Sequence, residues 1–231
     1  MNNQSLSGSV RLFKLFGITV YLHWTWFVML MYVTRLGTAH SWALIYFLTV
    51  FAIVVMHEFG HALACRSVGG KAERIVLWPL GGVAFVNPPQ RPGAVLWSIA
   101  AGPLVNVVLI PILFGLLFLP GVQSSAAIEA YLKWVFWFNL VILIFNMLPI
   151  YPLDGGQILQ SLLWFFLGRT KSLYIATVIG LIAAVAGGIF ALMVGNMWLV
   201  VMAGFIGLQA YNGFRAATIL AAYERQGGDR I

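Results

Sequence analysis

Long apolar runs separated by short polar segments dominate the chain. Six runs have the length and composition of transmembrane helices, because a helix that crosses a bilayer needs about 20 mainly apolar residues. They cover residues 15–34, 42–65, 94–119, 131–149, 172–194 and 196–216. The pattern predicts an all-α polytopic membrane protein with about six transmembrane helices joined by short loops.

The composition supports a membrane protein with a single domain. Of 231 residues, 61% are hydrophobic and 8% charged, whereas about a quarter of a soluble domain is charged. Six spans leave no room for a second soluble domain, so we expect one integral membrane domain over residues 1–231. It would have a polar N-terminal tail (1–9), one long loop (66–93) and a C-terminal tail (217–231). The N-terminal segment lacks the basic region and cleavage site of a removable signal peptide.

The basic residues indicate an orientation in the membrane. If the N-terminus is cytoplasmic, only Arg35 and Lys133 of the 13 basic residues lie on the outer side. The positive-inside rule therefore predicts a multi-pass protein of the cell membrane with both termini in the cytoplasm. The basic residues lie between apolar runs, so they do not indicate nucleic-acid binding.

The segment 131–168 is too long for one crossing and barely long enough for two. Two crossings would place the basic residues almost equally on both sides, which the positive-inside rule disfavours. Its centre, "NMLPIYPLDGG", contains Pro149 and Pro152, which lack amide donors, and two glycines that resist helix formation. We therefore expect one crossing by a broken fourth helix.

The loop 66–93 contains two short apolar runs, "RIVLW" and "GVAFV", on either side of residues 79–82. Such runs around a Pro/Gly turn predict a β-hairpin. The hairpin is too apolar to lie free in water, so we expect it to be associated with the membrane, between the second and third spans.

Three ionisable residues interrupt the second apolar run in "VVMHEFGHALA". His57 and His61 lie four positions apart, and therefore on one helical face, with Glu58 beside them. In this H-E-x-x-H pattern two imidazoles bind zinc and the glutamate acts as a base on water. The alternative is a pair of packing histidines with a buried, protonated glutamate. Ionisable groups in spans are rare and normally functional, which favours the metal site.

A hydrolytic zinc site needs a third protein ligand and an open position for water. Asp154, in the broken helix, is the one acidic residue outside the motif that lies within an apolar region. The other four are in loops or in the tail: Glu73, Glu129, Glu224 and Asp229. Asp-Gly is also a common turn pair, but an acid in this apolar setting needs a cation nearby. We therefore predict that Asp154 is the third ligand.

Three other residues could bind a metal but are weaker candidates. Cys65 shares the helical stripe of the two histidines, yet three ligands on one straight helix would not surround a tetrahedral ion. We interpret it as a small packing residue. His23 and His40 are expected to be interfacial or solvated.

Three motifs together give the sequence a family resemblance: "HEFGHALACRSVGG" at 57–70, "AGPLVN" at 101–106 and "FNMLPIYPLDGG" at 145–156. In order and spacing they resemble the site-2 protease family of intramembrane zinc metalloproteases, in its compact prokaryotic form. Many relatives carry a PDZ-type domain or nucleotide-sensing domains, and we expect neither in this protein.

The resemblance implies one zinc ion per chain, bound by His57, His61 and Asp154, with Glu58 as the catalytic base. It also implies substrate-binding residues. Asn146 would hold the reacting peptide, and Asn106 would support the site. The hairpin, around 79–85, would pair with an unwound substrate segment; the substrate-binding residues predicted are Asn146, Asn106, Gly81, Gly82 and Val83.

The function expected from this resemblance is zinc-dependent cleavage of transmembrane segments, as in regulated intramembrane proteolysis. Its partners would be the lipid bilayer, a membrane-protein substrate and an unidentified regulator or a protease that cuts the substrate first. One alternative is a metal transporter that binds its cargo with the same residues. Transporters often contain repeated halves, and the sequence shows no internal repeat. Another is an inactive relative that only binds membrane peptides.

Overall fold

The computed structural model describes residues 8–35, 40–78 and 81–226, and the chain divides into two compact units. The first unit comprises Met1–Gln90 and Ala100–Leu143, and the second comprises Arg91–Ile99 and Ile144–Ile231. The expectation that the whole chain is one protease domain stays a prediction.

Among the described residues, five helices are long and apolar enough to cross a membrane. They are α2 (His40–Ser67), α3 (Pro92–Leu116), α5 (Ala126–Asn146), α7 (Arg169–Val194) and α8 (Met197–Arg225). The short α4 (Pro120–Gln123) joins α3 to α5, and α6 (Asp154–Leu167) follows a break after α5. The polytopic helical fold and the broken helix are confirmed. Because α8 extends to Arg225, much of the predicted C-terminal tail is helical.

The first predicted span, residues 15–34, is not one long helix. Two strands, β1 (Ser9–Leu15) and β2 (Ile18–His23), precede a helix α1 (Thr25–Arg35) of only 11 residues. Such a helix is about 16 Å long, half the thickness of the hydrocarbon core. Phe16 and Gly17 both have positive φ, of 50° and 75°, and form the turn between the strands. The apolar run is therefore a hairpin and a short helix, and the N-terminal tail ends at β1.

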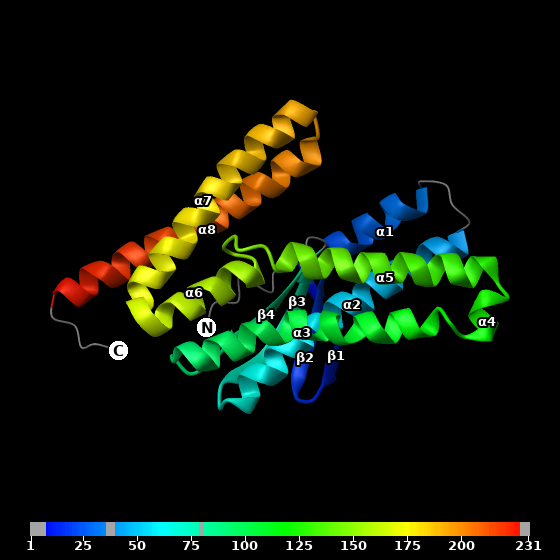
Figure 1. The fold of residues 1–231 in the computed structure, drawn as a ribbon, viewed down its shortest axis with the longest axis horizontal. Helices are drawn as coiled ribbons and strands as arrows, with labels where there is room; N and C mark the ends of the chain where they lie inside the picture. The colour runs from blue at the N-terminus through cyan, green and yellow to red at the C-terminus, as the bar shows by residue number, and fades with distance from the viewer. Residues whose placement is uncertain (1–7, 36–39, 79–80, 227–231) are drawn as a thin grey trace. The chain divides into compact units, whose positions relative to one another are not determined.

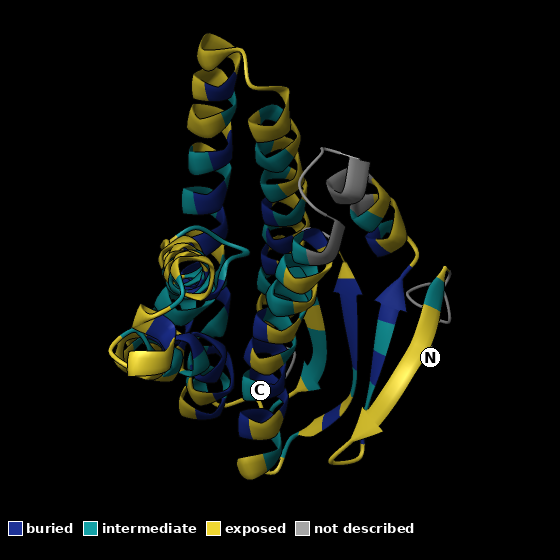
Figure 2. Ribbon diagram, turned by 90° about the vertical axis from the view of Figure 1, so that its right-hand side faces the viewer, coloured by how far each residue is buried: buried dark blue, intermediate teal, exposed yellow. Residues whose placement is uncertain are grey.

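The strands form one sheet in the order β1-β2-β3-β4. β3 (Lys71–Trp78) and β4 (Gly81–Asn87) pair antiparallel, which confirms the predicted hairpin; residues 79 and 80 lie outside the described residues. β2 pairs with β3 in parallel and with β1 antiparallel. Figure 2 shows the two central strands as largely buried and β1 as exposed. β4 is the second edge of the sheet.

The core of the first unit lies between this sheet and α2. Ile18, Val20, Ile75 and Leu77 are fully buried, and Phe59 from α2 belongs to the same cluster. β-branched side chains suit strands with a buried face. This packing fixes the hairpin against the half of α2 that carries the H-E-x-x-H motif.

In the second unit, α7 and α8 form an antiparallel pair (Figure 1) joined by Gly195, which adopts the left-handed conformation that favours glycine. Small residues bring the two helices together, since a Cβ at Gly180 would lie 3.1 Å from the Cβ of Ala210. Gly180 also has a second neighbour, because a Cβ there would lie 2.4 Å from the carbonyl oxygen of Tyr151. The pair therefore also packs against the segment between α5 and α6.

Candidate metal centre

His57 and His61 lie one turn apart on α2 and direct their rings to one point. Their Nε2 atoms are 3.1 Å apart, and both side chains are buried. Two imidazoles bound to one tetrahedral zinc ion, with Zn–N bonds of about 2.05 Å, have their nitrogens about 3.3 Å apart. The pair of nitrogens therefore fits two positions of a zinc coordination sphere.

Gly102, in the "AGPLVN" motif of α3, makes room for this arrangement. A Cβ at this position would lie 2.2 Å from His61 Nε2. Next to His61 on α2, a Cβ at Gly60 would lie 2.5 Å from the carbonyl oxygen of Ala101. The two glycines let the backbones of α2 and α3 approach closely. The imidazole of His61 fills the space that a side chain at position 102 would otherwise occupy.

The other nitrogen of His57 is held by α3. Its Nδ1 lies 2.6 Å from Oδ1 of Asn106, and the Asn106 amide donates to Oδ1 of Asn139 on α5 over 2.8 Å. Both asparagines are fully buried. The sequence did not single out Asn139. The available signal was its polar amide in the apolar run "VFWFNLVIL", since polar groups inside spans are usually functional.

Glu58 faces the edge strand of the sheet. The backbone N–H of Ala84 in β4 donates to Oε2 of Glu58 over 2.8 Å, and a Cβ at Gly82 would lie 2.6 Å from Oε1. The side chain is 6% exposed. The hairpin therefore contacts the predicted catalytic base directly, and Gly82 is the position where only a hydrogen atom fits beside the carboxylate.

In the second unit, Asp154 is the first residue of α6 and is 9% exposed. The following Gly155 and Gly156 pack against backbone atoms of residues 147–151, so no side chain fits at either position. Gln157 closes the loop by donating to the carbonyl oxygen of Pro152 over 2.9 Å. The "LDGG" sequence thus fixes where α6 begins. Asn146 is the last residue of α5 and is half-buried.

The weaker candidates have structural contacts. The Sγ atom of Cys65 donates to the carbonyl oxygen of Lys71 over 3.5 Å, in agreement with a packing role. His23 is buried rather than solvated: it bonds Thr25 Oγ1 over 2.7 Å and stacks on Trp78 with ring centroids 3.9 Å apart. The side chain of His40 lies outside the described residues.

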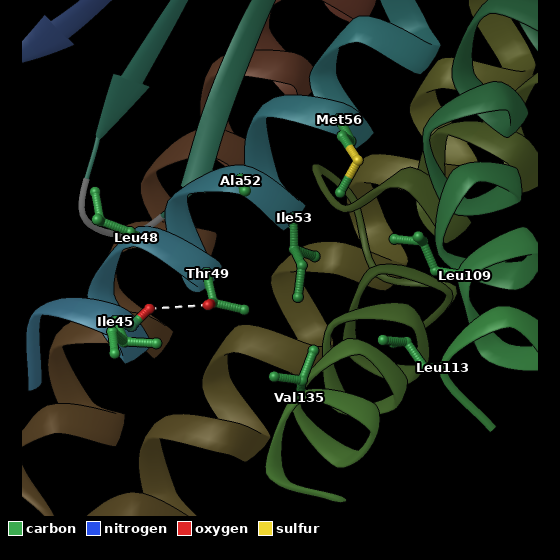
Figure 3. Close-up of a pocket in the computed structure, with 9 residues that line it drawn as sticks. All are labelled: Ile45, Leu48, Thr49, Ala52, Ile53, Met56, Leu109, Leu113 and Val135. Atoms are coloured by element: carbon green, nitrogen blue, oxygen red, sulfur yellow. Dashed lines mark hydrogen bonds between the residues drawn. The ribbon is translucent and has the colours of Figure 1, made fainter. Parts of the chain in front are cut away.

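An apolar groove lies next to the H-E-x-x-H motif, but His57, Glu58 and His61 do not line it. It has a volume of about 340 Å³ and is lined by residues of α2, α3 and α5, as Figure 3 shows: Ile45, Leu48, Thr49, Ala52, Ile53, Met56, Leu109, Leu113 and Val135. The hydroxyl group of Thr49 donates a hydrogen bond to the carbonyl oxygen of Ile45 over 2.8 Å. A surface of this kind, in helices long enough to span a bilayer, suits hydrocarbon and offers nothing for hydrolysis.

Comparison with known proteins places this geometry in a family. Residues 45–187 match the model of peptidase family M50. A zinc metalloprotease of Methanocaldococcus jannaschii is 34% identical over 204 residues, which are 86% of this chain and 58% of the relative. Stage IV sporulation protein FB of Bacillus subtilis is 34% identical over 126 residues, 53% of this chain and 40% of that protein. The chain thus spans about half the length of these relatives.

The structure of a site-2 protease from Methanocaldococcus jannaschii is similar, with a TM-score of 0.68 and 31% identity. The match covers 89% of this chain and 95% of that one. These comparisons give no support to a metal transporter. The family model spans His57, Glu58, His61, Asn106 and Asp154, and on this evidence the chain belongs to peptidase family M50, the site-2 protease family that its motifs resemble.

Proposed function

We propose that the protein is a zinc-dependent intramembrane endopeptidase that cleaves transmembrane segments of other membrane proteins. The observation that carries the proposal is the convergence of His57 Nε2 and His61 Nε2, 3.1 Å apart inside an apolar helix, with Glu58 as the next residue after His57. Family membership and a relative that is named a zinc metalloprotease support the choice of metal and reaction.

Asp154 is the third zinc ligand in this proposal. The sequence supports this choice, because Asp154 is the one acidic residue outside the H-E-x-x-H motif that lies within an apolar region. Two imidazoles and one carboxylate are a ligand set of hydrolytic zinc sites, which keep a fourth position for water or substrate. The tight packing of Gly155 and Gly156 supports the assignment, because it fixes the position of Asp154 at the start of α6.

Glu58 moves the proton during the reaction. When bound, zinc polarises the peptide carbonyl and makes water more acidic. The Glu58 carboxylate takes one proton from the attacking water as the new C–O bond forms, and returns it to the amide nitrogen as the C–N bond breaks. This carboxylate is buried, and the Ala84 amide orients it.

The hairpin binds the substrate as an extra strand. A peptide bond inside a helix is shielded, so the substrate must unwind and its free backbone groups need partners in the membrane. β4 is an edge strand and contacts Glu58, so a segment paired with Gly81, Gly82 and Val83 would lie beside the base. Asn146 would hold a polar group of the reacting peptide.

The protein lies in the cell membrane with both termini in the cytoplasm, as the distribution of basic residues supports. Five long helices alone would leave the termini on opposite sides. Arg66, near the end of α2, donates to the carbonyl oxygens of Phe16 and Gly17, so β2 and α1 lead from that end of α2 back to its start and make the sixth crossing in this proposal. His57 is ten positions from the end of α2 at Ser67, which places the site about 15 Å from the cytoplasmic end of this helix. Water would enter from that nearer side. Control of cleavage would come from the substrate, from a regulator or from another protease that cuts the substrate first.

The test is cleavage of a single-span substrate in proteoliposomes, together with analysis of bound zinc. We expect the wild type to bind about one zinc ion per chain, as an intact ligand set predicts. Glu58→Gln should retain the zinc and lose cleavage. Glu129→Gln, a matched change in the exposed ion pair with Lys133, should retain both. Cleavage by a zinc-loaded Glu58→Gln variant would exclude Glu58 as the base.

Substrate pairing can be tested by disulfide crosslinking in a Cys65→Ser background. Val83→Cys, at an exposed position of β4, should crosslink to cysteines near the cleavage position of the substrate. Phe13→Cys is the control, because it is exposed on β1 at the other edge of the sheet. Equal crosslinking at the two positions would argue against β4 as the docking strand.

A further inference from the structure

Three buried side chains connect one predicted zinc ligand to two neighbouring helices. Nδ1 of His57 bonds Oδ1 of Asn106, Nδ2 of Asn106 donates to Oδ1 of Asn139, and Nδ2 of Asn139 donates to the backbone carbonyl oxygen of Asn106 over 3.0 Å. We refer to these contacts as the asparagine relay. Its interpretation rests on the proposed function, in which His57 binds zinc.

The relay has a fixed direction because it ends on a backbone carbonyl. A side-chain amide has a donor end and an acceptor end that can exchange places by rotation. A backbone carbonyl oxygen can only accept. Asn139 must therefore turn its NH₂ group to the carbonyl of Asn106, and its own oxygen then faces the Asn106 side chain.

The same reasoning continues to His57. Because Asn139 presents an oxygen, Asn106 must turn its NH₂ group toward Asn139 and its oxygen toward the imidazole. An oxygen without a hydrogen 2.6 Å from Nδ1 requires that Nδ1 carries the proton. A neutral imidazole with its proton on Nδ1 has an in-plane lone pair on Nε2, the atom that faces His61.

We propose that Asn139 and Asn106 are positioning residues that select the metal-binding tautomer of His57. Asn106 then supports the site, as the family resemblance implied, and does so by acting on the metal ligand. Metal-bound histidines usually donate their second N–H to a carboxylate, a carbonyl or water. Here the side-chain oxygen of Asn106 accepts that N–H, and Asn139 prevents the amide of Asn106 from rotating by 180°.

Burial explains why two asparagines are needed. Asn106 and Asn139 are fully buried and His57 is 5% exposed. In water a solvent molecule could satisfy either orientation of Asn106, so the amide could rotate without cost. In a buried site in the membrane no water is available to satisfy a polar group, so the orientation of one amide determines the orientation of the next. Interhelical packing alone would need only one hydrogen bond between α3 and α5.

The test is a set of zinc affinities, measured on the detergent-solubilised full chain by competition with a chelator. We expect Asn139→Leu to weaken zinc binding by about 10- to 100-fold, the usual effect of losing an outer-shell partner. Asn106→Asp should bind zinc at least as tightly as the wild type, because a carboxylate facing His57 can only accept. In the Asn106→Asp background, Asn139→Leu should cost less than about threefold.

The loss of zinc affinity on Asn139→Leu, compared between the wild-type and the Asn106→Asp backgrounds, distinguishes tautomer selection from a role of Asn139 in helix packing alone. If Asn139 only joins α3 to α5, Asn139→Leu lowers the zinc affinity by the same factor in both backgrounds. That result would overturn the inference. Tyr131→Phe is the matched control. It removes the hydrogen bond from α5 to Thr49 on α2, eight residues before Asn139, and should leave the affinity unchanged.

A second readout does not depend on bound zinc. Nitrogen-15 NMR of the metal-free protein, at a pH where imidazoles are neutral, reports which nitrogen of His57 carries the proton. We expect Nδ1 in the wild type and in Asn106→Asp, and a mixture in Asn139→Leu. Protonation on Nε2 in the wild type would overturn the relay even if every variant were unstable. If the wild type binds no zinc while His57 is protonated on Nδ1, the proposed function fails and the relay remains.

Discussion

Gly102 lies so close to His61 that a Cβ at position 102 would be 2.2 Å from His61 Nε2. We predict that Gly102→Ala moves the imidazole and weakens zinc binding by about 10-fold or more, since overpacking in a close-packed site costs about 1–3 kcal/mol. Gly115→Ala, later in the same helix, meets no atom within 4 Å and should bind zinc normally. Chelator competition measures both, and equal affinities would contradict the prediction.

Gly82 has the same close relation to Glu58, the proposed base. A Cβ at this position would lie 2.6 Å from Oε1 of Glu58, so Gly82→Ala should displace the carboxylate or the strand. We expect cleavage to fall by about 100-fold, within the range that a general base contributes. Zinc content should be unchanged, because the nearest atoms to a Cβ at Gly82 all belong to Glu58. Gly187→Ala in α7, with no neighbour within 4 Å, is the control.

The contact between α7 and Tyr151 predicts an effect on stability. Gly180→Ala would place a Cβ 2.4 Å from the Tyr151 carbonyl oxygen, and this backbone atom cannot move without shifting the segment before Asp154. We expect a loss of about 1–3 kcal/mol, or a fall of about 2–12 °C in the thermal midpoint. If Gly180→Ala and Gly187→Ala have the same thermal midpoint, the contact with Gly180 does not hold Tyr151 in place.

Zinc removal should destabilise the protein in proportion to its occupancy. With zinc at about 100 times its Kd, binding adds about 2.7 kcal/mol of stability, so a chelator should lower the midpoint by about 5–10 °C. Asp154→Asn, which keeps the shape but not the charge, should reduce this zinc-dependent shift strongly. Glu129→Gln should keep the full shift. If Asp154→Asn shows the full zinc-dependent change in the thermal midpoint, Asp154 is not a zinc ligand.

Much of the candidate site could be predicted from the sequence because its chemistry is local. His57, Glu58 and His61 are within about one turn of one helix, so their spacing alone puts them together. Asp154 was predicted by elimination, since it is the one acid outside the motif that lies in an apolar region. Asn139 was missed because its contact is with residue 106, 33 positions away. A single asparagine in an apolar run has no spacing pattern that reveals its partner.

The fold was predictable where hydrophobic length decides the structure, and not where strands compete with helices. The five long helices each fill a run that is long and apolar enough to cross a bilayer. The run 15–34 is also apolar, but Gly17 and the alternation of β2 allow a hairpin that pairs with β3. The pairing of β2 with β3 joins residues 55 positions apart, such as Thr19 and Arg74, and hydropathy carries no information about it.

The sheet has a practical consequence for anyone who engineers this protein. β2 is an inner strand, and its parallel partner β3 carries the hairpin that contacts Glu58. An N-terminal truncation that removes β2 would leave β3 with an open edge, and such edges recruit strands from other chains. Shortened versions would therefore both aggregate and misplace the hairpin. Fusions therefore belong after α8, and β2 is part of the scaffold that holds the hairpin against Glu58.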